Sequence, residues 1–188
     1  MLRINDTRFL DLMNEQAKIG GTIDGGLTRP SLSEADIQVR KWFQNQVESH
    51  GLDYTMDGAG NQSGILKSDQ VDAKTLVIGS HLDSVPNGGR FDGALGVIVA
   101  LEAALSLKDA NKKLPFHVEV INFTDEEGTL VGLLGSAALA SLLSDESLAK
   151  PRGGRDTLEQ GMARIGISDN SILACITKGH MRQLKLIP

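Results

Sequence analysis

Apolar residues recur every three or four positions in two stretches near the start of the chain, a spacing typical of amphipathic helices. The first stretch covers 6–19 and is followed by two glycines, and its apolar face comprises Phe9, Leu12, Met13, Ala17 and Ile19. The second follows a Gly-rich loop. It begins where Ser31 and Glu34 have the spacing of a capping box, in which a hydroxyl and a carboxylate each satisfy a free backbone amide. Gly51 marks its expected end.

Alternation of apolar and polar residues replaces the helical period after Gly51. Leu52, Tyr54 and Met56 lie on one side of a short strand, and the turn "GAGN" leads to a second strand at 63–66. The sequence further predicts a buried strand over 74–81, a largely buried helix over 93–110, a strand over 116–123 and a helix over 135–149. Strands that alternate with helices of this length indicate an α/β fold with a mixed, partly parallel sheet. After residue 150 the pattern weakens to one short helix, and 176–188 is predicted to be an irregular tail.

Composition places the chain among ordinary globular proteins. Its 188 residues are 40% hydrophobic with a net charge of −5, enough for one domain but without the basic face that a nucleic acid or an anionic membrane requires. The single cysteine, Cys175, excludes an internal disulfide and suits a reducing compartment. The N-terminus has no apolar core of a signal peptide, and no apolar run approaches the length of a membrane span, so we expect a cytoplasmic protein.

The candidate chemistry lies at the ends of two predicted strands. His81 closes the strand over 74–81, Asp92 ends the Gly-rich loop that follows, and "TDEEG" at 124–128 closes the next strand. Ligands of parallel α/β sheets bind at these carboxyl ends. Adjacent carboxylates raise one another's pKa, so three acids in a row either point apart into water or are held by a cation.

Divalent metals offer one explanation of this group of residues. Zinc binds imidazole and carboxylate, a carboxylate can bridge two metals, and a free carboxylate can act as general base. Each element by itself is more often structural: a lone His at a strand end is usually hydrogen-bonded, and a run of acids is usually solvated. Their combination favours a metal site. A nucleotide-binding site is the weaker alternative, because no G-x-G-x-x-G follows a predicted strand.

The motifs around these residues closely resemble those of a known enzyme family. "GSHLDSVPNGGRFDGALGV", with "FTDEEG" downstream and "GGLTRPSLSEAD" and "DGAGN" upstream, is similar to the N-carbamoyl-L-amino-acid hydrolase and allantoate amidohydrolase family. That family is related to dinuclear-metal aminoacylases and carboxypeptidases. The resemblance covers about residues 5–165 and implies a three-layer, zinc-exopeptidase-like catalytic domain. It also implies two divalent cations, Zn²⁺ or Mn²⁺, with Co²⁺ or Ni²⁺ as alternatives.

The resemblance implies a role for each candidate residue. His81 matches a ligand of one metal, Asp92 the carboxylate that bridges both, and Glu127 a ligand of the second. Glu126 matches the general base that activates water, and Asp83 the carboxylate that orients the His81 ring from behind. The implied reaction is hydrolysis of a linear amide or ureido C–N bond, as in N-carbamoyl amino acids, ureidopropionate or allantoate.

The sequence also departs from the family pattern. Members of the family are about twice as long and continue with a "HIEQG" motif, a lid domain that forms the dimer, and a final histidine ligand. None of these is found in this sequence, and His180 in "KGHMRQL" does not match. We therefore expect residues 1–188 to be the N-terminal part of a shortened catalytic domain, without the family's homodimer interface.

Two expectations follow for function. With two protein ligands per cation instead of the usual three, the chain alone should bind metal weakly and hydrolyse little substrate. Alternatively, it is a non-catalytic homologue that buries an unfinished sheet edge against another chain, since open edges favour strand pairing.

Overall fold

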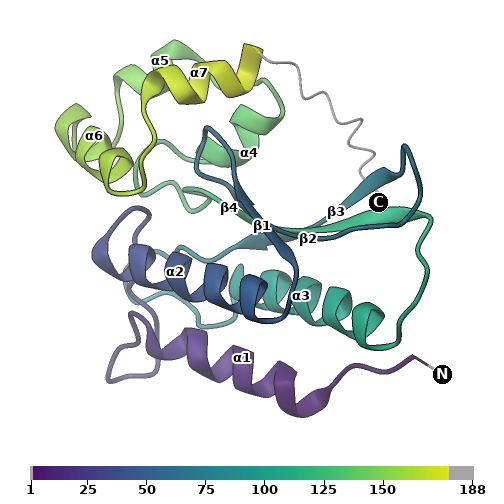
Figure 1. Cartoon of the computed structure of the whole chain (residues 1–188). Coiled ribbons are helices and arrows are strands. Elements are labelled where there is room, and N and C mark those ends of the chain that lie inside the picture. The colour runs from purple at the N-terminus through teal and green to yellow at the C-terminus, as the bar shows by residue number, and fades with distance from the viewer. Residues whose placement is uncertain (1, 178–188) are drawn as a thin grey trace.

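The computed structural model describes residues 2–177 and centres on one mixed sheet (Figure 1). The strand order is β1-β2-β4-β3; β1 and β2, and β2 and β4, pair antiparallel, whereas β3 and β4 pair parallel, with His81 opposite Phe123. The strands are β1 (Asp53–Met56), β2 (Gln62–Leu66), β3 (Lys74–His81) and β4 (Phe116–Phe123). The predicted mixed, partly parallel sheet is confirmed.

Helices cover both sides of this sheet (Figure 1). On one side lie α1 (Asp6–Lys18), α2 (Glu34–Ser49) and α3 (Ala94–Asp109). On the other lie α4 (Leu134–Leu139), α5 (Asp145–Ala149), α6 (Arg155–Arg164) and α7 (Asp169–Thr177). Helix α3 makes the crossover between the parallel strands β3 and β4, as the predicted α/β order requires.

Two apolar cores hold these layers together. The larger lies between the sheet and the helices α1, α2 and α3. It includes Phe43 and Val47 of α2, Leu101 of α3, and Val118 and Val120 of β4. The smaller joins the helices on the other side, with members Leu130, Leu134, Leu158, Met162 and Ile172. No helix among residues 2–177 is both long and apolar enough to cross a membrane.

The start of α2 differs from the predicted capping box. The N-cap is Ser33, whose hydroxyl accepts from the Asp36 amide, while the Asp36 carboxylate accepts from the Leu32 amide. The box is therefore shifted by two residues, because Leu32 takes a left-handed conformation with φ of 58° and turns the chain before the helix begins. Ser31 is left outside the cap.

Strand β3 was expected to be buried, and this prediction is wrong. It forms the end of the sheet, and only α3 packs along it closely, so its residues are partly exposed. Leu76 is 37% exposed, whereas His81 at the strand's end is buried. An apolar sequence therefore does not distinguish an edge strand from a central one.

The predicted helix over 135–149 is interrupted. Helix α4 ends at Leu139 and α5 begins at Asp145, with Ser144 as N-cap accepting from the Ser147 amide. Ser141 takes a left-handed φ of 59° between them. Serine side chains that bond nearby backbone compete with helix continuation. The short helix after 150 is α6, while α7 was not predicted and includes residues 176 and 177 of the expected tail; 178–188, with His180, lie outside the described residues.

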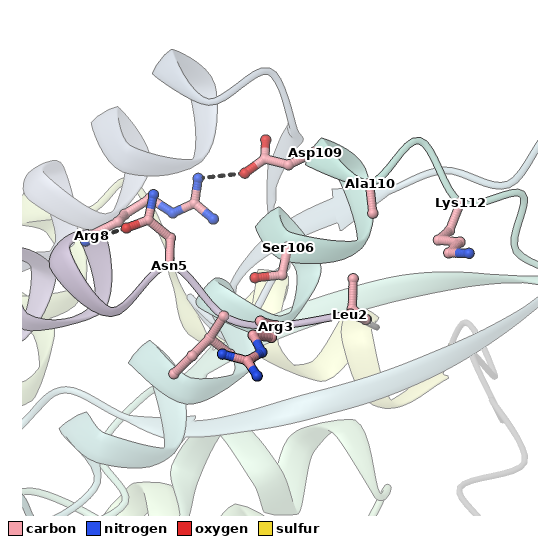
Figure 2. Close-up of a pocket in the computed structure, with 9 residues that line it drawn as sticks. Leu2, Arg3, Asn5, Arg8, Ser106, Asp109, Ala110 and Lys112 are labelled. Atoms are coloured by element: carbon pink, nitrogen blue, oxygen red, sulfur yellow. Dashed lines mark hydrogen bonds and ion pairs between the residues drawn. The ribbon is translucent and has the colours of Figure 1, made fainter.

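The N-terminal segment is held to α3 by a buried acid. Glu102 accepts from the Asn5 amide at 2.8 Å and from Nε of Arg8 at 2.7 Å, and Ser106 donates to it at 2.7 Å. Figure 2 shows Arg8 reaching Asp109 at the end of α3, where Nη1 donates to the carboxylate at 2.7 Å. These bonds hold the segment against a cleft that Leu2 and Lys112 also line, and none of the described residues that line this cleft belongs to the strand ends discussed below.

Candidate metal centre

His81 is buried at the carboxyl end of β3 with one ring nitrogen already engaged. Nδ1 lies 3.1 Å from the backbone carbonyl oxygen of Asp83. A carbonyl oxygen can only accept, so Nδ1 is the donor in this contact and Nε2 is the ring nitrogen left for another partner. The backbone contact thus leaves Nε2 as the nitrogen that a metal could bind.

Two carboxylates face this free nitrogen. Oε2 of Glu126 lies 3.3 Å from Nε2 of His81, and Oδ1 of Asp92 lies 4.0 Å from it. Glu126 follows β4, and Asp92 ends the loop before α3; the parallel register of β3 and β4 brings both to the end of the sheet where His81 lies. Asp92 is exposed and Glu126 is partly buried, so the group opens to solvent.

Asp83 connects the two strand ends through both its backbone and its carboxylate. Its Oδ1 lies 3.6 Å from Nδ1 of His81, beyond hydrogen-bond distance, so the carbonyl rather than the carboxylate bonds the ring. The carboxylate instead accepts from the amides of Glu126 at 3.4 Å and Glu127 at 3.3 Å. Glu127 is thereby placed through its backbone.

The surroundings of Asp83 are strongly desolvating. The pKa of Asp83 is raised to about 7, mainly by burial and also by the Asp36 and Asp125 carboxylates, while His81 and the Glu127 amide act to lower it. Close by, burial lowers the pKa of Arg29 to about 10, against the opposing charges of Asp36 and Asp83. The segment before α2 therefore supplies a buried cation to the same region as these acids.

Arg29 is a structural residue that the sequence reasoning missed. Its fully buried guanidinium donates to the carbonyls of Leu82, Gln16 and Ile19 at 2.6–2.9 Å. It thus ties the end of α1 to the residue between His81 and Asp83. An arginine in a polar loop gives no pattern that predicts burial; only its place in the motif "LTRPS" set it apart.

The three consecutive acids after β4 make different contacts. Asp125, with a left-handed φ of 53°, is buried and accepts from the amides of Leu130, Val131 and Gly132 at 2.6–3.1 Å. Glu126 turns to His81, whereas Glu127 is bonded to Asp83 through its amide. Asp125 therefore shapes the loop, a role the sequence reasoning did not assign to it.

Gly93 supplies the space for the His81 ring. It precedes α3 with φ of 63°, and a Cβ there would lie 2.4–2.5 Å from three ring atoms. Glycine is thus required at this position for two reasons, its left-handed conformation and the close approach of the His81 ring. The space that a side chain would fill at Gly93 is taken by the imidazole of His81.

The donor types at this end of the sheet suit a divalent cation. A free imidazole nitrogen and carboxylate oxygens are ligands of zinc and related metals. As the side chains stand, no group of three or more His, Cys, Asp or Glu within residues 2–177 is arranged to hold a metal ion. The types of donor fit a divalent cation, but the described residues bring only pairs of donors together and not a group of three.

Comparisons with known proteins agree with the motifs. The profile of peptidase family M28 matches residues 61–153. The chain is 40% identical over 126 residues to an N-carbamoyl-L-amino-acid amidohydrolase from Rhizobium meliloti, covering 67% of this chain and 30% of that protein. It is 31% identical to an allantoate amidohydrolase from Bacillus subtilis, covering 76% of this chain and 35% of that one.

A solved structure extends the likeness to the fold. A hydantoinase/carbamoylase family amidase from Burkholderia phymatum superposes with a TM-score of 0.79 at 36% identity, over 90% of this chain and 41% of that one. This chain belongs to the hydantoinase/carbamoylase amidase family. As a member of that family it carries the α/β catalytic fold, and it spans well under half the length of these three relatives.

Proposed function

We propose that this hydantoinase/carbamoylase family chain contributes the metal-binding strand ends of an amidohydrolase that cleaves linear amide or ureido C–N bonds. In this proposal His81, Asp92 and Glu127 are metal ligands, and Glu126 is the general base. The observation that carries it is the position of Nε2 of His81, at 3.3 Å from Oε2 of Glu126 and 4.0 Å from Oδ1 of Asp92. Residues 1–188 would then be part of a catalytic domain.

Each side chain has a specific task in this reaction. When bound, two divalent cations would polarise the scissile carbonyl and make the attacking water more acidic. Glu126 takes a proton from that water as its oxygen bonds to the carbonyl carbon, and returns the proton to the leaving nitrogen as the C–N bond breaks. The Asp83 carbonyl keeps Nδ1 of His81 protonated, so that Nε2 stays available as a ligand.

The substrate class is inferred from the relatives. Their names specify N-carbamoyl-L-amino acids and allantoate, both of which carry a terminal ureido group. Hydrolysis of an N-carbamoyl amino acid by this route yields the amino acid, ammonia and carbon dioxide. Zn²⁺, Mn²⁺, Co²⁺ and Ni²⁺ all accept imidazole and carboxylate, so each belongs in the test.

Calorimetric metal titration of the purified chain, followed by assays with N-carbamoyl amino acids and allantoate, tests the proposal. We expect His81→Ala to weaken metal binding by about tenfold or more, whereas His50→Ala, at the end of α2, leaves it unchanged. Glu126→Gln should keep metal binding and lower any turnover by about 10²–10⁴-fold. Equal metal affinity in the two histidine variants would refute the ligand assignment.

The weak metal binding and low turnover expected from two ligands per cation stay a prediction. The same titration measures it directly. Tight binding and rapid hydrolysis by the purified chain would show that the described donors suffice.

One observation favours a second candidate, a non-catalytic partner of another chain. Strand β3 ends the described sheet, with Leu76 exposed, and Leu95 and Val99 of the adjoining α3 are 42% and 50% exposed. An open edge beside apolar side chains is suited to pairing with another chain. Light scattering across a range of protein concentrations decides: a monomer at all of them excludes self-pairing.

A further inference from the structure

A second hollow lies on the far part of the loop that carries Glu126 and Glu127. It has a volume of about 330 Å³ and is enclosed by the segment before α2, by Thr129 and Leu130 of that loop, and by α6. Its polar lining includes Ser31, Ser33, Thr129, Arg152, Thr157 and Arg164. None of its described lining residues belongs to the strand-end group around His81.

The charge of this hollow is positive. Arg152 and Arg164 line it, and none of the described lining residues is acidic. Nη1 of Arg152 donates to the Gly128 carbonyl at 2.6 Å, and Nη1 of Arg164 donates to the Leu32 carbonyl at 3.3 Å. Both of these acceptors are backbone carbonyls, which leave the positive charge of each guanidinium without a carboxylate partner in these bonds. A guanidinium has five N–H donors, so most of the donors of each remain available.

A buried hydroxyl in the wall of the hollow favours a ligand with acceptor oxygens, as the positive charge does. Ser31 is 5% exposed, and its Oγ has no hydrogen-bond partner among the described residues. Its amide donates to Thr129 Oγ1 at 2.9 Å, whereas its hydroxyl is left without a partner among the described residues. A buried hydroxyl without a partner is unfavourable, and an acceptor oxygen placed in the hollow would satisfy it.

The neighbouring helix adds little to this preference. Ser33, the N-cap of the 16-residue helix α2, also lines the hollow. The first turn of that helix already carries two acids, Glu34 and the buried Asp36, and the Asp36 carboxylate accepts from the Leu32 amide. The preference for an anion therefore rests on the two guanidiniums and the unsatisfied hydroxyl donor.

We propose that this hollow binds a small oxyanion, a carboxylate or a phosphate group, held by Arg152 and Arg164 with the Ser31 hydroxyl as a third donor. Arg forks match the geometry of both groups. The site is separate from the proposed metal centre, and its occupancy does not depend on metal or on hydrolysis.

Calorimetric titration with inorganic phosphate and, separately, with succinate tests this at constant ionic strength. We expect saturable binding of at least one of these two anions, and the anion that binds identifies the preferred chemical group. The melting temperature should rise in its presence. Arg152→Gln/Arg164→Gln should weaken binding by roughly tenfold or more. Lys41→Gln/Lys113→Gln removes the same charge from two exposed positions outside the hollow and should leave binding unchanged.

Further variants separate loss of the site from loss of the fold. If the double arginine variant does not fold, Arg164→Gln alone decides, because Arg164 is exposed. Ser31→Ala should fold normally and bind the anion more weakly. The proposal is overturned if neither anion binds saturably, if the arginine variants bind as well as the unmodified protein, or if the lysine variant loses binding equally.

Discussion

Nε2 of His81 lies 3.3 Å from Oε2 of Glu126, although His81 ends β3 and Glu126 follows β4. Their proximity depends on the parallel pairing of β3 and β4, which ends with His81 opposite Phe123. The imidazole is fixed from behind by the Asp83 carbonyl, and the Glu126 amide by the Asp83 carboxylate. One aspartate thus positions both members of the pair, through its backbone and its side chain.

This dual role predicts the effect of Asp83→Asn. The carbonyl bond to His81 is kept, but an amide group presents one acceptor atom where the carboxylate presents two to the Glu126 and Glu127 amides. We expect metal affinity to fall by about 10–100-fold with the fold intact. Calorimetric metal titration measures it, with Asp24→Asn, in an exposed loop, as the control. Unchanged affinity in Asp83→Asn would mean that the carboxylate does not position the loop.

Gly93→Ala should destabilise the protein more than an alanine at another left-handed glycine. Its Cβ would overlap the His81 ring, whereas a Cβ added at Gly25, with φ of 83°, would meet nothing within 4 Å. We expect Gly25→Ala to cost about 1 kcal/mol, from its conformation alone, and Gly93→Ala to cost at least about 2 kcal/mol more. Urea unfolding of both variants gives the comparison. Equal losses would show that the ring moves aside at no cost.

The ion pair between the partly exposed Arg8 and the buried Glu102 should make stability fall in acid. Burial raises the pKa of Glu102, but hydrogen bonds from Arg8, the Asn5 amide and Ser106 outweigh it and hold the pKa below its ordinary value. Unfolded chains therefore take up a proton at Glu102 before the folded protein does. The stabilisation is complete above the ordinary glutamate pKa of about 4.3 and is lost as the pH falls through the folded value.

Urea unfolding as a function of pH tests this, with Glu102→Gln as the variant. We expect the variant to lose part of the pH dependence below about pH 4.3. Glu159→Gln is the matched control, because that side chain is 56% exposed in its bond with Arg155 and should change stability by about 0.5 kcal/mol or less. A Glu102→Gln variant with the unmodified pH profile would contradict the assignment.

The shifted cap of α2 separates two neighbouring serines. Ser33→Ala removes the hydroxyl that accepts from the Asp36 amide and should cost about 1 kcal/mol. Ser31→Ala removes a hydroxyl without a partner among the described residues, so in buffer without phosphate or carboxylates it should cost nothing or stabilise slightly. Thermal unfolding of the two variants distinguishes them. The reverse order of stabilities would restore Ser31 as the cap.

The sequence by itself determined most of the elements and their order. Helical spacing located α1 and α2, alternation located β1, β2 and β4, and apolar runs located β3 and α3, while the motifs around His81 and "TDEEG" indicated the family. These signals are local, because the period of a helix or strand is set by its own backbone and by which face is covered. They required no knowledge of distant contacts.

Only the tertiary structure decided how the atoms at the strand ends are used. It made β3 an edge, buried Arg29 and Asp125, assigned the carbonyl of Asp83 to His81, and placed Gly93 under the imidazole ring. Each of these depends on partners from segments far apart along the chain. Hydrogen bonds and burial act between atoms within a few ångströms of one another, and which atoms come that close is settled by packing rather than by residue order.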